Sequence, residues 1–373
     1  MLKLNVPAIG PEEAEAAAAV LATGYLTQGP RAAEFEQVTA AHTGSRHAFA
    51  TSSATTGLHL ALVAMGVGPG DEVVLTDYSF PATANVIVQQ GATPVFVDIR
   101  LDDFNLDPEL LDAAITPRTK VIMPVHAFGL VADMDPINAI AARHGVPVLE
   151  DAACALGGTY HGRQAGAIAT AGVFSYHPRK IITTGEGGMI TTDDDAIAER
   201  IRVLRSHGAV RGSHYMSFVE AGFNYRLSDI NAAIGIVQMS RLAQLLTTRR
   251  ALAARYEHEL QRIDEAVAPV TPAGREHTFQ SYVVLLDPAV DRDRVIDEMR
   301  ARGIETTIGT YSMHLQPYFR DRLGIADGAL PHSTRAHYSA LTLPLHTAME
   351  ESHVVTVVDA LAESIRHSRA RNA

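Results

Sequence analysis

A lysine in a glycine-rich loop is the first feature of this sequence that could do chemistry. Lys180 ends the segment FSYHPRK, and the flexible stretch GEGG follows it at residues 185–188. Lysine forms Schiff bases with carbonyl compounds when burial or nearby cations lower its pKa. Most lysines are solvated surface charges, so Lys180 alone does not establish this role.

Two further segments could bind a cationic ring and an anion. Asp151 closes the apolar run VPVLED, where its carboxylate could pair with a cationic ring nitrogen, cap a helix or bind a metal. The run TSSATTG at residues 51–57 leads into an apolar helix, whose free N–H groups and dipole could bind an anion. An ordinary N-cap would explain the same hydroxyl residues. The nucleotide-binding motifs GxxxxGKS/T and GxGxxG are absent from the sequence.

The segment GFNYRLSD at residues 222–229 precedes a long helical pattern. Ser228 or Asp229 could cap that helix. Asn224 and Arg226 could be ordinary surface residues, so the segment by itself assigns them no role.

The elements that must position these residues alternate between short strands and helices. We predict strands at 73–76, 94–98, 121–125 and 146–150, with helices at 82–90 and 136–144. The strands are apolar on both faces, as in a mostly parallel sheet covered by helices on each side. Residues 172–175 and 188–191 are predicted to form a strand pair joined by a functional loop. Sheets of this kind bind ligands at the carboxyl ends of their strands.

The predicted fold class is α/β with two domains. A large domain at 1–250 holds the mostly parallel mixed sheet flanked by helices, and its N-terminal segment could contact the second domain. A smaller C-terminal α+β domain at 251–373 holds a strand at 281–286 and a helix at 292–302. A long helix over about 228–264 could join the two.

The composition limits the classes of partner. Asp and Glu number 42 against 31 Lys and Arg, and this net charge of −11 argues against a nucleic-acid backbone as the main partner. The single cysteine, Cys154, excludes a disulfide framework and a cysteine-rich metal site. No apolar run is long enough for a signal peptide or a membrane span. We therefore expect a soluble cytoplasmic enzyme without a metal, a membrane or a nucleic acid as partner.

Taken together, these segments resemble the DegT/DnrJ/EryC1/StrS family of sugar aminotransferases, which depend on pyridoxal phosphate (PLP) and have the type I fold of aspartate aminotransferase. The similarity runs from YLTQGP at 25–30 through PVHAFG at 124–129 to residues 311–317. It is most specific at 174–188, where the family signature FSxHxxK followed by TxGEGG is met almost residue for residue. The resemblance implies PLP as cofactor and a homodimer whose subunits share their active sites.

The resemblance assigns the chemistry around the cofactor ring to a few residues. Lys180 matches the lysine that holds PLP as a Schiff base and moves the proton between the substrate's α-carbon and the cofactor's C4′ carbon. Asp151 matches the aspartate that keeps the pyridinium nitrogen protonated, and Phe80 matches an aromatic residue stacked on the ring. The family usually has Gln or His near the cofactor's 3′ oxygen, where this chain has Cys154, and a thiol is a weak donor.

Other positions match residues around the cofactor phosphate. Ala54 and Thr55 match the turn that binds the phosphate, and Ser175 matches a further donor to it. Asn224 matches a residue that reaches the phosphate in the neighbouring subunit.

The resemblance also suggests substrate-side residues. Arg226 is a weaker match for a residue that binds a substrate carboxylate. Tyr311 and His314, in the segment YSMHLQP, match a stretch that lies near the sugar. A structural histidine is equally compatible with His314.

The resemblance predicts a ping-pong transfer of an amino group from L-glutamate to a nucleotide-linked keto sugar. A keto-cyclitol of the inosose type stays open as the acceptor. A sugar 3-dehydratase of the same fold is disfavoured, because that branch has histidine in place of Lys180. A non-catalytic regulator is disfavoured because Lys180, Asp151 and Ser175 are all present.

Overall fold

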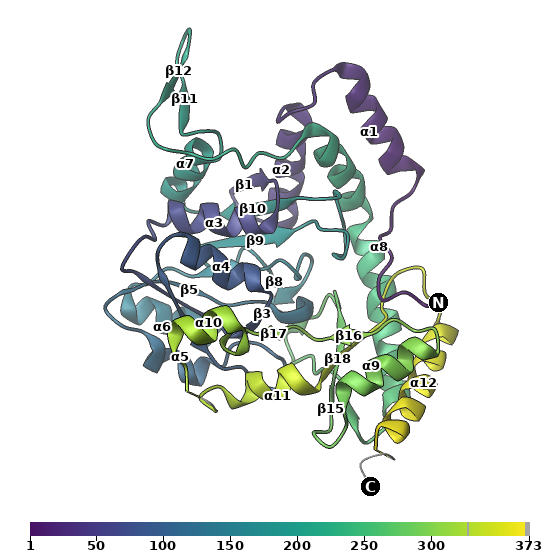
Figure 1. Cartoon of the computed structure of the whole chain (residues 1–373). Coiled ribbons are helices and arrows are strands. Elements are labelled where there is room, and N and C mark those ends of the chain that lie inside the picture. Colours follow the sequence, from purple (N-terminus) through teal and green to yellow (C-terminus); the bar gives the residue numbers. More distant parts are fainter. Residues whose placement is uncertain (327, 370–373) are drawn as a thin grey trace.

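The computed structural model describes residues 1–326 and 328–369. Its larger part contains a mixed sheet in which four strands, in the order β1-β10-β9-β6, continue into β5-β2-β4 (Figure 1). Parallel bridges from Ile122 to Val148 and from Val125 to Asp151 join the two groups. Strand β10 is antiparallel to both its neighbours, and the other pairings are parallel. The strands are β1 (His47–Thr51), β2 (Glu72–Thr76), β4 (Thr93–Val97), β5 (Thr119–Met123), β6 (Leu149–Asp151), β9 (Ala171–Ser175) and β10 (Gly188–Thr192).

Helices cover both faces of this sheet, because successive strand residues point to opposite sides. Val73 and Leu75 pack with helices α3, α4 and α7, whereas Val74 packs with α2, α5, α6 and the first half of α8. These three layers confirm the predicted α/β fold. The helices are α2 (Pro30–Thr43), α3 (Ala54–Ala64), α4 (Pro81–Gln89), α5 (Pro108–Ala114), α6 (Met134–His144), α7 (Asp195–Leu204) and α8 (Asp229–Leu260), and α1 (Pro11–Thr23) packs on α8.

The predicted strands agree with the observed ones to within two residues at each end, except at the start of β6. Residues 172–175 and 188–191 form the antiparallel pair β9 and β10, as predicted. Strand β6 begins at Leu149 and not at Val146. The N–H group of Val146 donates to the carbonyl of Ala141 at 3.0 Å as helix α6 ends, and Pro147 has no N–H group for a strand ladder.

The second part of the chain contains an antiparallel sheet in the order β13-β15-β18-β16. The second half of α8 contributes Leu252 and Tyr256 to its core, where they pack with residues such as Val284 and Leu361. The predicted boundary at residue 250 falls inside α8 and stays a prediction. The elements are β13 (Ala266–Val267), β15 (Tyr282–Leu286), α9 (Arg292–Ala301), β16 (Thr307–Ile308), α10 (Pro317–Leu323), α11 (Pro331–Ser339), β18 (Ala340–Leu343) and α12 (Glu351–Arg369).

Short pairings connect the two parts. Strand β17 (Tyr311–Ser312) pairs with β3 (Tyr78–Ser79). Strand β14 (Arg275–Glu276) pairs with β7 (Thr159–Tyr160), which also pairs with β8 (Arg163–Gln164). At the N-terminus, Leu2 forms a parallel bridge with Ile304.

One hairpin projects from the body of the molecule. It consists of β11 (Ala209–Arg211) and β12 (Met216–Phe218), and Figure 1 shows it extending away from the sheet beyond α7. Short 3₁₀ helices at Ala127–Gly129 and Met313–Leu315 complete the elements. Within residues 1–326 and 328–369, no helix is long and apolar enough to cross a membrane.

Candidate active site

Three neighbouring strands bring distant residues together at one edge of the large sheet. Their register pairs Thr51 with Gly188, and Gly188 with Ser175. Helix α3 begins just beyond Thr51, and its N-cap residue Ser53 accepts a hydrogen bond from the N–H of Thr56 at 3.1 Å. Ser175 and the start of α3 therefore lie at the same sheet edge.

The start of α3 has the properties of an anion site. Ala54 and Thr55 are its first residues, and N–H groups in the first turn of a helix have no partner within the helix. A Cβ atom at Gly188 would lie 2.5 Å from the carbonyl of Ser53 and 2.6 Å from the nitrogen of Ala54, so only glycine lets the strand pass this closely. The free N–H groups, the helix dipole and the nearby Ser175 hydroxyl suit a phosphate.

Asp151 ends β6 as a buried carboxylate. The Thr83 hydroxyl donates to Oδ2 at 2.7 Å, and the N–H of Ala153 donates to Oδ1 at 3.2 Å. Burial raises the pKa of Asp151, although these two bonds and the nearby Lys180 ammonium oppose the shift. A further cation would stabilise the ionised form, so the site fits a protonated ring nitrogen.

Lys180 is half-buried, and its Nζ donates to the Sγ of Cys154 at 3.0 Å. Cys154 is a free cysteine, and the sequence resemblance places it near the cofactor's 3′ oxygen. The structure therefore places the lysine, this cysteine and Asp151 in one region.

Helix α8 holds the loop that follows Lys180. The N–H of Thr183 donates to Oε1 of Gln238 at 3.2 Å. Asn231 donates from Nδ2 to the carbonyl of Thr184 at 2.6 Å and to that of Glu186 at 3.2 Å. These contacts fix the loop to a long rigid element, so it can present Lys180 in a defined position.

Two aromatic residues are exposed beside these groups. Phe80 is 66% exposed at the N-cap of α4, and the register of β17 places Tyr311, 37% exposed, opposite Ser79. The Ser79 hydroxyl lies 2.8 Å from that of Thr83, which connects this segment to Asp151. An exposed aromatic ring here suits the face of a planar ligand.

His314 is buried, and both of its ring nitrogens have partners. Nδ1 lies 2.7 Å from Oδ2 of Asp77, and Nε2 lies 3.2 Å from the hydroxyl of Thr334. Its backbone N–H also donates to Asp77, at 2.8 Å. This geometry favours a structural role for His314, one of the two roles that the sequence left open. A contact between His314 and a sugar stays a prediction.

The segment with Asn224 and Arg226 lies along the end of β1. Arg226 forms an antiparallel bridge with Thr51, and the N–H of Ser52 donates to the carbonyl of Tyr225 at 2.9 Å. Nε of Arg226 donates to Oδ1 of Asn224 at 3.0 Å, and Asn224 is exposed. Both residues therefore lie near the start of α3, within the same chain.

Sequence reasoning missed the residues that hold this site from a distance. Thr83, Asn231 and Gln238 lie in helices and match no local motif, so the sequence carries no signal for them. Ser228 caps α8 by accepting from the N–H of Asn231 at 3.2 Å. Asp229 instead accepts from N–H groups at the start of α2, at 2.7 Å from Gly29 and 3.0 Å from Ala32.

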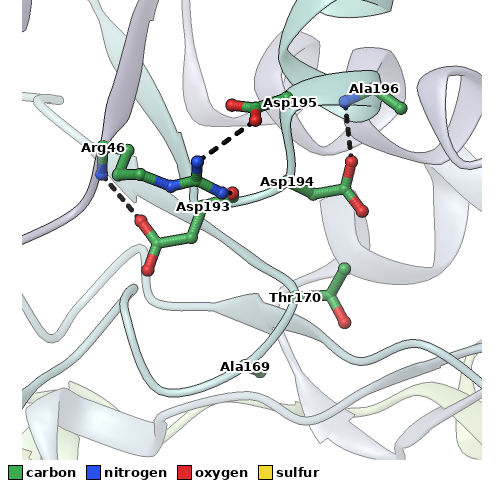
Figure 2. Close-up of a pocket in the computed structure, with 7 residues that line it drawn as sticks. All are labelled: Arg46, Ala169, Thr170, Asp193, Asp194, Asp195 and Ala196. Atoms are coloured by element: carbon green, nitrogen blue, oxygen red, sulfur yellow. Dashed lines mark hydrogen bonds and ion pairs between the residues drawn. The ribbon is translucent and has the colours of Figure 1, made fainter.

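A hollow beside Arg46 belongs to the opposite edge of the sheet (Figure 2). It is lined by Arg46 and Asp193–Asp195, next to the ends of β1 and β10 that lie farthest from Ser175. The N–H of Arg46 donates to Asp193 at 2.7 Å, and Asp194 caps α7 through Ala196 at 2.8 Å. Within the described chain no cluster of three or more His, Cys, Asp and Glu residues could hold a metal ion.

The fold and this sheet edge are those of a fold type I enzyme that uses PLP. The aminotransferase TlmJ from Streptoalloteichus hindustanus superimposes with a TM-score of 0.93, at 35% identity over 98% of this chain and 99% of that one. The PMP form of Spr1654 from Streptococcus pneumoniae also gives 0.93, at 28% identity over 97% and 98% of the chains. GDP-perosamine synthase from Caulobacter vibrioides is 43% identical over 332 residues, or 88% of each chain.

The sequence matches the DegT/DnrJ/EryC1/StrS aminotransferase family over residues 7–362, and the chain belongs to this family. It is therefore a PLP-dependent aminotransferase. This confirms the family, the cofactor and the enzyme class that the sequence predicted.

Proposed function

We propose that this enzyme transfers the amino group of L-glutamate to the keto carbon of a nucleotide-linked sugar, with Lys180 as its catalytic amine. The observation that supports this most directly is the location of Lys180 near the buried carboxylate of Asp151, at the sheet edge where α3 begins. GDP-perosamine synthase, the relative at 43% identity, is named for a nucleotide-linked amino sugar, which supports this acceptor class.

Each residue at this edge of the sheet has a separate role in the proposed reaction. PLP, when bound, supplies an electron sink for the negative charge that develops at the donor's α-carbon. Nζ of Lys180 moves the proton to and from that carbon, as general base and then general acid. The carboxylate of Asp151 would hold a proton on the ring nitrogen of the bound cofactor. The Phe80 ring would cover one face of the cofactor ring and exclude water from it.

The anion site at the start of α3 would hold the cofactor phosphate. The N–H groups of Ala54 and Thr55 and the hydroxyl of Ser175 are its donors from one chain. Asn224 of the partner subunit would complete it in a homodimer. The exposed aromatic residues Tyr215 and Phe218 on the projecting hairpin support the dimer, since a second copy would cover them (Figure 1).

The chain offers a direct test of the amine, because its only lysines are Lys3, Lys120 and Lys180. Purified protein is mixed with PLP, reduced with borohydride and digested, and the modified peptide is identified by mass spectrometry. We expect the label on Lys180. The variant Lys180→Ala should lose the PLP absorbance band and glutamate turnover, whereas Lys3→Ala and Lys120→Ala, both at exposed positions, should retain them. A label on another lysine, or full turnover in Lys180→Ala, would refute the assignment.

The acceptor is tested with the enzyme after it has reacted with L-glutamate. Keto sugars linked to different nucleotides and keto-cyclitols are offered separately, and the products are read by mass and NMR. We expect amine transfer to a nucleotide-linked keto sugar. Transfer to cyclitols alone would contradict the proposed acceptor class and leave the aminotransferase chemistry intact.

A further inference from the structure

A narrow cleft lies beside the loop that carries Lys180. Its walls are the N-terminal segment, this loop, the segment before β15, and strands β16 and β18 of the small sheet. The cleft has a volume of about 100 Å³. Six polar residues line it: Asn5, Arg179, Gln280, Ser281, Thr307 and Thr342.

Backbone contacts hold Arg179 at this cleft. Its N–H donates to Nδ1 of His177 at 3.2 Å, and its carbonyl accepts from Nε2 of Gln280 at 3.0 Å. The neighbouring carbonyl of Pro178 accepts from Nδ2 of Asn5 at 3.0 Å. The loop is thus attached to the N-terminal segment on one side and to the segment before β15 on the other.

The guanidinium of Arg179 has no hydrogen-bond or ion-pair partner among the residues that the structure describes, and it is exposed. Many arginines of this chain are paired, as Arg275 is with Asp103 at 3.1 Å. The protein has a net charge of −11, but an unpaired guanidinium immediately before Lys180 attracts anions locally.

We propose that this cleft binds a carboxylate of the amino donor through the guanidinium of Arg179. Guanidinium groups bind carboxylates through two parallel hydrogen bonds, and the amide and hydroxyl groups of the lining supply further donors. A cavity of about 150 Å³ can hold a benzene molecule, so a cleft of about 100 Å³ has room for a carboxylate. This inference rests on the proposed function, because the bound donor must react with the cofactor held at Lys180, the residue after Arg179.

Arg226, which the family resemblance suggests for a substrate carboxylate, differs in its surroundings. Its Nε already donates to Asn224, and its backbone forms a bridge to Thr51 at the end of β1. Neither guanidinium has an ion pair among the described residues, but that of Arg179 also has no hydrogen-bond partner there, and Arg179 adjoins Lys180 in sequence. The two arginines can therefore be tested separately.

The test uses the holoenzyme and glutarate, a dicarboxylate that lacks the reacting amine. Calorimetric titration should show that Arg179→Gln raises the dissociation constant of glutarate roughly 10- to 100-fold, the loss expected for hydrogen bonds to a charged group. The matched control is Arg322→Gln, since Arg322 is an exposed arginine on α10, away from the cleft lining. It should bind glutarate as the wild type does.

Each half-reaction is then followed alone in a stopped-flow instrument. Arg179→Gln should raise the L-glutamate concentration for half-maximal rate by a similar factor and leave the reaction with the acceptor unchanged. The proposal would be overturned if the wild type did not bind glutarate, or if Arg179→Gln bound it unchanged. It would also be overturned if Arg179→Gln mainly impaired the reaction with the acceptor, or if only Arg226→Gln impaired the reaction with L-glutamate. If the wild type fails to react with L-glutamate, the proposed donor is wrong, and the glutarate titration still tests the cleft.

Discussion

The buried hydrogen bond from Thr83 to Asp151 leads to a quantitative prediction for cofactor binding. Thr83 is 1% exposed and Asp151 is 5% exposed, and their oxygens lie 2.7 Å apart. Thr83→Val keeps the shape of the side chain and removes the hydroxyl. A hydrogen bond to a charged group contributes about 1.5–3 kcal/mol. The loss acts on PLP through the ionisation of Asp151: at pH values where the variant's carboxyl becomes protonated, PLP should bind up to roughly 10- to 100-fold more weakly, since 1.4 kcal/mol is tenfold in affinity.

The same substitution should change the pH dependence. Burial raises the pKa of Asp151, and the Thr83 hydroxyl is the first of the contacts that lower it. Thr83→Val should therefore raise this pKa further. Only the ionised carboxylate pairs with a cationic ring nitrogen, so PLP affinity falls as the pH falls through this pKa. The variant should lose affinity at a higher pH than the wild type.

The assay is a PLP titration of apo-protein, followed by absorbance at a series of pH values. Thr83→Ser is the matched control, because it keeps the hydroxyl and should bind PLP within a few-fold of the wild type. Circular dichroism establishes that both variants are folded. If Thr83→Val bound PLP as the wild type does at every pH, the bond between Thr83 and Asp151 would have no influence on the cofactor.

Three further predictions concern other contacts of the site. Cys154→Gln should shift the absorbance maximum of bound PLP, because an amide is a stronger donor than a thiol; an unchanged spectrum would place Cys154 away from the ring. His314→Leu should lower the free energy of unfolding in urea by about 1–3 kcal/mol, because Oδ2 of the buried Asp77 loses its ring partner, and should leave both substrate KM values unchanged; a large KM change would restore a substrate role. Gln238→Leu removes the amide that donates to the buried Glu13 at 2.6 Å, so it should lower Tm. It also removes the contact with the loop after Lys180, so it should weaken PLP binding. An effect on Tm alone would contradict the role of Gln238 in holding this loop.

Much of the fold follows from local patterns in the sequence. The strands at 73–76, 172–175 and 188–191 are found within β2, β9 and β10, because runs that are apolar on both faces require a covered sheet. The long helical pattern becomes α8, which ends at Leu260. The order of strands in the sheet follows from pairings between distant segments, such as β1 with β10, and no local pattern predicts them.

Only some residues of the candidate site could likewise be predicted from local patterns in the sequence. Residues inside contiguous motifs, such as Lys180 and Ser175, could be selected from the sequence because their spacing is local. Thr83 and Asp151 are 68 positions apart, and Asp229 holds the start of α2 about 200 positions away. A local rule predicts that Asp229 caps its own helix, α8, whereas in the folded chain Asp229 accepts hydrogen bonds from the start of α2.

Helix α8 couples the position of Lys180 to the small sheet. Its first half holds the loop after Lys180 through Asn231 and Gln238, and its second half inserts Tyr256 into the core of the second part. Gln238 and Tyr256 are about 27 Å apart along a continuous helix, at 1.5 Å per residue. A shift of the small sheet would therefore have to bend α8 or break the contacts of Gln238.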